Sequence, residues 1–173
     1  MGKTLIRLLH LRGLQRKCIL FRVNRQLAGV KAFEKKRKLL NRLEEFSIGE
    51  GTKIVGPIES WGKLTVGKDC WIGKNLILNG NGSVTIGDNC DIGPDVTFQT
   101  GGHEIGDSTR RAGKGLTHHQ IIGNGVWIGG RATVIGSVTV GDSSVIAGCA
   151  CVTKSVEANT LAGGVPAKVI REL

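Results

Sequence analysis

The chain has 173 residues, a length that favours one repeat domain with a short appendage over two separate domains. Aromatic residues make up only 4 % of it and glycines number 27, which argues against a broad aromatic core and favours a narrow one. The formal net charge of +10 arises in residues 1–46, with 13 lysines and arginines against three acids, whereas residues 47–173 carry 11 of each sign.

Residues 1–46 are expected to form a basic helical arm, because leucines recur at helical spacing between the charges, with breaks at Gly13 and Gly29. Charges interrupt this arm too often for a transmembrane span or a signal peptide, so we expect a cytoplasmic protein. Two interpretations of the arm stay open. It either lies on an anionic surface, such as the inner face of a membrane or an acidic partner, or caps the repeat domain. We expect no nucleic-acid partner, because no recognition motif accompanies the charge.

An aliphatic residue returns every six positions in the second half of the chain, at Ile122, Ile128, Val134, Val140, Ile146 and Val152. Neither a helix nor an ordinary strand has this period. It is the hexapeptide repeat of a β-solenoid with three flat faces per coil, so we predict an all-β solenoid over residues 47–157. The same spacing occurs earlier, at Ile48, Ile54, Val66, Ile72 and Leu78, and after a two-residue slip at Ile86, Ile92 and Phe98.

Residues 99–121 interrupt the repeat with a polar, charged and glycine-rich segment. A solenoid has no structural need for such an excursion loop, which makes it the first place to look for function. After residue 157 the chain is expected to leave the solenoid as a C-terminal tail, residues 158–173, in which Gly163, Gly164 and Pro166 end the last coil.

Three segments closely resemble the maltose and galactoside O-acetyltransferase family. They are GGHEIGD at 101–107, IIGNGVWIGGRATVIGSVTVGDSSVIAGCACVTKSV at 121–156 and AGGVPAKVI at 162–170. The resemblance implies a left-handed parallel β-helix, an exception to the usual right-handed crossover. It also implies a homotrimer with active sites in the clefts between subunits, acetyl-coenzyme A as acyl donor, and no metal.

The resemblance implies direct transfer of the acetyl group to a sugar hydroxyl, with His103 as the catalytic general base. The backbone N–H of Gly130 is implied as the oxyanion donor, and Trp127 as a wall of the acceptor pocket. Small and basic residues are implied along the coenzyme, from its pantetheine arm to its phosphates: Gly130, Ala147, Gly148, Thr153, Lys154, Lys168 and Arg171.

The acceptor is less defined by the sequence. Asn79 and Asn81 lie where the family binds its sugar, and Arg110 and Arg111 in the excursion loop either grip an anionic or polyhydroxylated acceptor or lie on the surface. An amino-sugar or antibiotic acceptor stays open. Two other classes stay open as well: a metalloprotein like the γ-class carbonic anhydrases, tested at the pair His118 and His119, and a non-catalytic scaffold.

Overall fold

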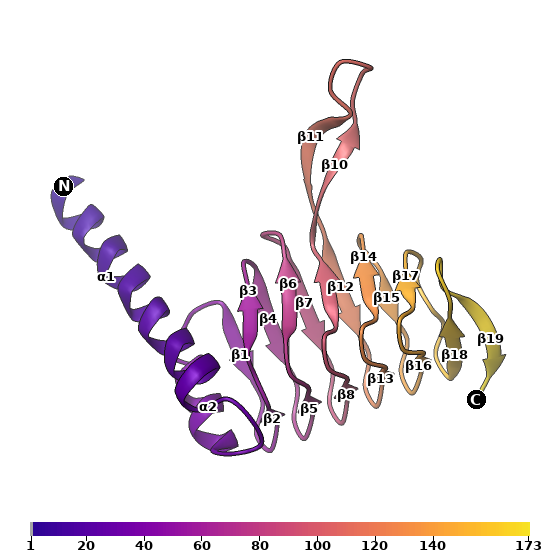
Figure 1. The fold of residues 1–173 in the computed structure, drawn as a ribbon, viewed down its shortest axis with the longest axis horizontal. Coiled ribbons are helices and arrows are strands. Elements are labelled where there is room, and N and C mark those ends of the chain that lie inside the picture. Colours follow the sequence, from indigo (N-terminus) through magenta and orange to yellow (C-terminus); the bar gives the residue numbers. More distant parts are fainter. Residues whose placement is uncertain (1) are drawn as a thin grey trace.

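The computed structural model describes residues 2–173 as a triangular solenoid with a helical arm at its N-terminal end (Figure 1). Three parallel sheets form its faces, and each coil contributes one strand to each sheet. Sheet A contains β1 (Phe46–Ile48), β4 (Lys63–Val66), β7 (Ser83–Ile86), β12 (His119–Ile122) and β15 (Thr139–Val140). Sheet B begins with β2 (Lys53–Ile54), β5 (Trp71–Ile72), β8 (Asp91–Ile92), β13 (Trp127–Ile128) and β16 (Val145–Ile146). Sheet C contains β3 (Ile58–Ser60), β6 (Leu76–Asn79), β9 (Thr97–Gln99), β14 (Thr133–Ile135) and β17 (Cys151–Val152).

The six-residue period places one aliphatic side chain per strand inside the prism. Ile122 pairs in register with Ile86 on one side and Val140 on the other, and all three are buried. The shift between paired residues is 18 positions where the repeat is regular, and 20 where the Gly80–Gly82 turn adds two residues between β6 and β7. The predicted solenoid, its inward residues and the position of the slip are therefore confirmed.

The basic arm consists of α1 (Gly2–Phe21), the π-helical turn η1 (Arg22–Gln26) and α2 (Phe33–Leu40). Helix α1 runs continuously through Gly13, so the predicted break at that residue is wrong, whereas Gly29 does lie between helices with a φ of +94°. Helix α2 and η1 cover the first coil, and Val23 and Leu40 are buried in the same core as the solenoid. The structure therefore shows a cap. No helix of residues 2–173 is both long enough and apolar enough to cross a membrane.

Three side chains of the arm bind the exposed edges of the first coil, one on each sheet. The carboxamide of Asn41 exchanges two 2.8 Å hydrogen bonds with the backbone of Ile48 in β1. Lys36 Nζ donates to the carbonyl oxygen of Val55, which follows β2, at 3.0 Å. Asn24 binds both backbone groups of Ile58 in β3. Because an open sheet edge is a template for aggregation, these contacts protect the N-terminal end of the solenoid.

The excursion is not an irregular loop but a two-stranded antiparallel hairpin, β10 (Gly101–Ile105) and β11 (Ala112–Thr117). It leaves the prism at the corner between sheets C and A and projects far beyond the coils (Figure 1). We expected residues 158–173 to leave the solenoid, and this expectation is wrong. Strand β18 (Thr160–Gly163) pairs in parallel with β16 and β19 (Lys168–Glu172) folds back on it, so both extend sheet B.

Candidate active site

The hairpin fixes the tautomer of His103. Its backbone pairs with that of Gly115, and its ring Nδ1 lies 2.9 Å from the carbonyl oxygen of Gly113. A carbonyl oxygen only accepts hydrogen bonds, so in the neutral ring Nδ1 carries the proton and Nε2 keeps its lone pair. The side chain is exposed. His103 thus presents an unprotonated ring nitrogen to solvent, as a general base requires.

Buried polar side chains anchor the base of the hairpin. Gln120 is only 1 % exposed, and its Nε2 donates to the carbonyl oxygens of Gln99 at 3.0 Å and Gly136 at 2.9 Å. The hydroxyl of buried Thr100 donates to the carbonyl of Asn79 at 3.0 Å. Sequence reasoning missed both anchors, although a glutamine at an inward-facing position of a strand was the available signal.

Gly130 lies at the corner between sheets B and C, in the turn from β13 to β14. Its carbonyl accepts a 3.0 Å hydrogen bond from the N–H of Cys149, whereas its own N–H donates to no group among residues 2–173. Gly148 stacks on it one coil later, where an added Cβ would lie 3.2 Å from the Gly130 oxygen. Together with Ala147, these residues form a small-residue corner with a free backbone donor, which suits an extended ligand that brings a carbonyl oxygen.

His103 and Gly130 are not brought together within one chain. Gly130 precedes β14 and the hairpin follows β9, so Gly130 lies where the strands of sheet C begin and the hairpin lies where they end. The strand from Gly130 to the far corner at Ser137 spans roughly 20 Å at the usual rise per residue. A single chain therefore carries two half-sites, which we call the hairpin half and the corner half.

The predicted acceptor residues divide between these halves. Asn79 ends β6 at the hairpin edge, and the side-chain oxygen of Asn81 accepts a 3.1 Å hydrogen bond from Thr117 at the base of the hairpin. Arg110 and Arg111 lie at the hairpin tip, beyond the Ile105–Ala112 pair, with Arg111 bound to the Gly106 carbonyl at 3.2 Å.

Trp127 belongs to the corner half. It projects from sheet B with 56 % of its surface exposed, beside a shallow hollow of about 290 Å³ that Trp71 also lines. Trp71, by contrast, contacts Phe33 of α2 edge to face at 5.7 Å between ring centroids, so part of its ring is covered within the chain.

Only some of the predicted coenzyme-binding residues lie near the corner half. Lys168 pairs with Gly163 in the final turn of sheet B, close to the same corner as Gly148. Thr153 and Lys154 follow β17 and are exposed towards the hairpin edge of sheet C. Arg171 lies farther along β19, opposite Leu161, and its guanidinium donates to the Glu172 carbonyl at 3.1 Å.

His118 and His119 bind different partners. His118 Nδ1 lies 3.2 Å from the hydroxyl of Ser137 and His119 Nδ1 lies 2.8 Å from that of Ser83, in coils on opposite sides of β12. Within residues 2–173, no three histidine, cysteine, aspartate or glutamate side chains gather as metal ligands would.

Comparison with known proteins agrees with this architecture. The family model described as the hexapeptide repeat of succinyl-transferase matches residues 63–94 and 120–154, which defines a hexapeptide-repeat protein. Galactoside O-acetyltransferase of Escherichia coli K12 is 36 % identical over 81 % of this chain and 70 % of its own length. The chain belongs to the galactoside O-acetyltransferase family of hexapeptide-repeat proteins. A putative acetyltransferase of Saccharomyces cerevisiae is 37 % identical over 64 % of this chain, which spans just over half (56 %) of that relative.

Two solved structures share the fold. A galactoside acetyltransferase in complex with coenzyme A superposes with a TM-score of 0.78 at 32 % identity, covering 93 % of this chain and 80 % of the other. A hexapeptide-repeat acetyltransferase of Vibrio cholerae O1 biovar El Tor, in complex with acetyl-coenzyme A, gives a TM-score of 0.81 at 26 % identity, covering 95 % and 88 %. These likenesses confirm the predicted left-handed parallel β-helix.

Proposed function

We propose that the protein is an acetyl-coenzyme A-dependent O-acetyltransferase that acts on a sugar or glycan hydroxyl. The observation that carries this proposal is the presence in one chain of two complementary half-sites: a histidine whose Nε2 has no partner among the described residues, and a corner glycine whose N–H likewise has none. The family relationship and the coenzyme complexes of the two similar structures support the choice of donor.

The reaction follows from these groups. The acceptor oxygen attacks the thioester carbon while its proton moves to Nε2 of His103. The negative charge on the carbonyl oxygen is met by the N–H of Gly130. When the carbon–sulfur bond breaks, the imidazolium returns the proton to the sulfur, so coenzyme A leaves as the thiol and the histidine is restored. The hydrogen bond to Gly113 holds the ring in the same orientation throughout.

Because one chain keeps the two half-sites apart, the proposed cleft lies between copies. The hairpin half of one subunit faces the corner half of its neighbour, and three copies close the ring that the family resemblance implies. Exposed Trp127 then forms the wall of the cleft beside Gly130.

The test of the proposal is release of free coenzyme A thiol from acetyl-coenzyme A with a panel of hexoses, oligosaccharides and amino sugars. Wild type is compared with His103→Ala. Release that depends on a hydroxyl acceptor and disappears in the variant supports the proposal. Transfer that requires an amino sugar or an aminoglycoside would replace it with N-acetylation. Coenzyme binding without release by any acceptor would contradict it.

We further propose that the reaction takes place at the inner face of a membrane, which α1 contacts peripherally. One face of the helix carries exposed apolar side chains three and four positions apart, at Leu11, Leu14, Cys18 and Phe21. The opposite face packs on the cap through Ile19, and residues 2–33 include no acid. An exposed apolar stripe on a helix whose own charged residues are all basic suits an anionic bilayer, although Arg12 and Arg16 also pair with Glu44 and Glu45.

Vesicle sedimentation tests this contact. Deleting the arm would also remove the cap, so a double variant, Leu14→Glu with Phe21→Glu, is preferred because both side chains are exposed. Wild type should sediment with phosphatidylglycerol vesicles at low salt and not with phosphatidylcholine vesicles, and the double variant should stay in solution. Equal behaviour of the two proteins would refute the contact.

A further inference from the structure

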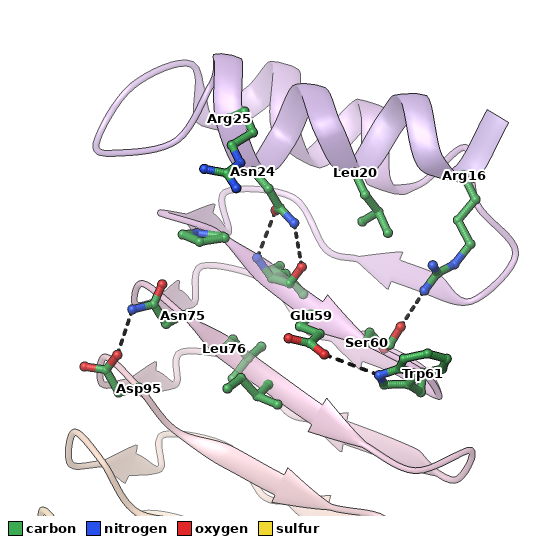
Figure 2. Close-up of a pocket in the computed structure, with 13 residues that line it drawn as sticks. Arg16, Leu20, Asn24, Arg25, Glu59, Ser60, Trp61, Asn75, Leu76 and Asp95 are labelled. Carbon is green, nitrogen blue, oxygen red and sulfur yellow. Dashed lines mark hydrogen bonds between the residues drawn. The ribbon is translucent and has the colours of Figure 1, made fainter. Parts of the chain in front are cut away.

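A groove separates the arm from the outer face of sheet C, over the first two coils and the adjoining corner of the third (Figure 2). It encloses about 630 Å³. Arg16, Leu20 and Arg25 reach into it from α1 and η1, and Glu59 and Ile77 project from the outward-facing positions of β3 and β6. It lies apart from His103 and Gly130, and neither residue lines it.

One end of the groove is formed by an exposed tryptophan. Trp61 is 73 % exposed, although large aromatic side chains are usually covered in a folded protein. Its indole N–H points to the carboxylate of Glu59 at 3.4 Å, and the Arg16 guanidinium binds the neighbouring Ser60 carbonyl. The ring is thus held at the groove while its surface stays open, as a stacking platform requires.

The other end is formed by paired polar side chains. Asn75 donates to one carboxylate oxygen of Asp95 at 2.8 Å, which leaves the second oxygen for a ligand. Arg25 of η1 also lines the groove. It forms no salt bridge within residues 2–173. Planar groups pair well with neighbouring hydroxyls, because a carboxylate offers two acceptors side by side, a guanidinium two donors, and an amide one of each.

The lining therefore fits a polyhydroxylated chain better than the alternatives. Two arginines are balanced by Glu59 and Asp95, and Arg16 is already paired with Glu45 at 2.6 Å, so a strongly anionic ligand is not favoured. The apolar side chains of the lining, among them Leu20, Pro57 and Ile77, lie between charged ones, so a wholly apolar ligand would cover charges without offering them a partner. A neutral sugar ring, by contrast, offers a C–H face for Trp61 and hydroxyls for the polar groups.

The position of the groove connects it to the proposed reaction. Asn75, Asp95 and Gly130 occupy the same corner between sheets B and C in successive coils. The Asp95 N–H binds the Lys74 carbonyl, and the N–H of Arg131 binds the Pro94 carbonyl, each at 2.8 Å. Neighbouring coils are about 4.8 Å apart, so the Asp95 end lies one coil from the oxyanion donor. A short glycan can span that separation.

We propose that this groove is an additional binding site for a neutral oligosaccharide, next to the cleft, which holds the acceptor chain while its terminal unit is acetylated at the cleft. The inference rests on the proposed function for its role in catalysis, but binding itself does not require catalysis. It makes the acceptor a glycan chain rather than a free monosaccharide.

The test is calorimetric titration of the full chain, without acetyl-coenzyme A, with maltoheptaose, cellohexaose and chitohexaose. Wild type, Trp61→Ala, His103→Ala and Phe21→Ala are compared, the last as an exposed aromatic outside the groove. At least one oligosaccharide should bind wild type, with the dissociation constant raised at least tenfold in Trp61→Ala only. No binding of the three, or equal binding by Trp61→Ala, would overturn the inference.

A kinetic measurement separates this inference from the proposed function. With an active acceptor series, Trp61→Ala should raise KM for the oligosaccharide about tenfold and leave KM for the monosaccharide and for acetyl-coenzyme A unchanged. Oligosaccharide binding that depends on Trp61, without any acetyl transfer, would uphold the groove and refute the acetyltransferase. Acetyl transfer with an unaltered KM for the oligosaccharide in Trp61→Ala would uphold the acetyltransferase and refute the groove.

Discussion

Asn24 and Ile58 exchange two hydrogen bonds, one from the Asn24 carboxamide to the Ile58 carbonyl at 2.7 Å and one from the Ile58 N–H to Asn24 Oδ1 at 2.9 Å. A side chain of the helical arm thus takes the place of a neighbouring strand at the edge of β3. The helical end is therefore bound to the solenoid by directional contacts as well as by apolar packing.

Replacing Asn24 should loosen this end of the molecule. Asn24→Ala leaves the N–H and the carbonyl of Ile58 without partners, so we expect a loss of about 1–3 kcal/mol in the free energy of unfolding. Asn24→Asp keeps the acceptor and loses the donor, and should fall between wild type and Asn24→Ala. Urea denaturation followed by circular dichroism measures the order. Equal stability of the three proteins would show that the contact does not stabilise the edge.

Lys36 makes stability depend on pH. Its ammonium group is buried, donates to the carbonyls of Gly29 and Val55, and lies 4.8 Å from the centre of the Phe33 ring. Burial, reinforced by the charge of Lys31, lowers the pKa of Lys36 from 10.5 to about 8. Between these values the unfolded chain binds a proton that the folded chain does not, so wild type should gain stability as pH rises from about 8 to 10.5.

Lys36→Met is the matched control, because its unbranched side chain is only one atom shorter and lacks the titrating group. The difference in unfolding free energy between wild type and this variant should shift in favour of wild type across that pH range and stay constant below pH 8. The measurement is a series of urea titrations at stepped pH. A constant difference throughout would mean that the pKa of Lys36 is not lowered.

His103→Ala should lower kcat about 10²–10⁴-fold, the usual contribution of a general base, with little change in KM for acetyl-coenzyme A. Glu104→Gln, the neighbouring exposed residue, should retain activity close to wild type. Thiol release under saturating donor measures both variants. A loss of less than tenfold in His103→Ala would assign the base to another residue.

Gly148→Leu should block the coenzyme path. The added Cβ would lie 3.2 Å from the Gly130 oxygen, and the rest of the side chain would project over the small-residue corner. We expect a rise of at least tenfold in KM for acetyl-coenzyme A, with KM for the acceptor unchanged. Gly13→Ala, where an added Cβ meets nothing within 4 Å, is the control. An unaltered donor KM would move the coenzyme away from this corner.

Much of the fold could be predicted because the repeat is local. A buried aliphatic residue every six positions, such as Ile128 and Val134, reports the geometry of each coil without knowledge of its neighbours. Gly13 misled us because a single glycine costs a helix only about 1 kcal/mol, which the flanking helix formers offset. Strand β18 was missed because it completes one face of a coil without repeating the whole hexapeptide pattern.

The candidate site was less accessible to sequence reasoning. The pattern around His103 identified a candidate base, but not that Gly113, ten residues later, binds its ring, since that contact depends on the register of the hairpin. The groove beside Trp61 depends on where α1 packs. That contact joins residues far apart in the sequence, such as Asn24 and Ile58, and no local pattern encodes it.

The placement of His103 and Gly130 at opposite edges of one sheet has a genetic consequence. Two inactive proteins, one defective only in the hairpin half and one only in the corner half, should restore activity when they are expressed together. In the proposed trimer, a ring that mixes the two proteins contains at least one cleft in which an intact histidine of one subunit meets an intact corner of the next. Co-expression of His103→Ala with Gly148→Leu should therefore give mixed rings that release more coenzyme A thiol, at low acetyl-coenzyme A, than either variant does alone.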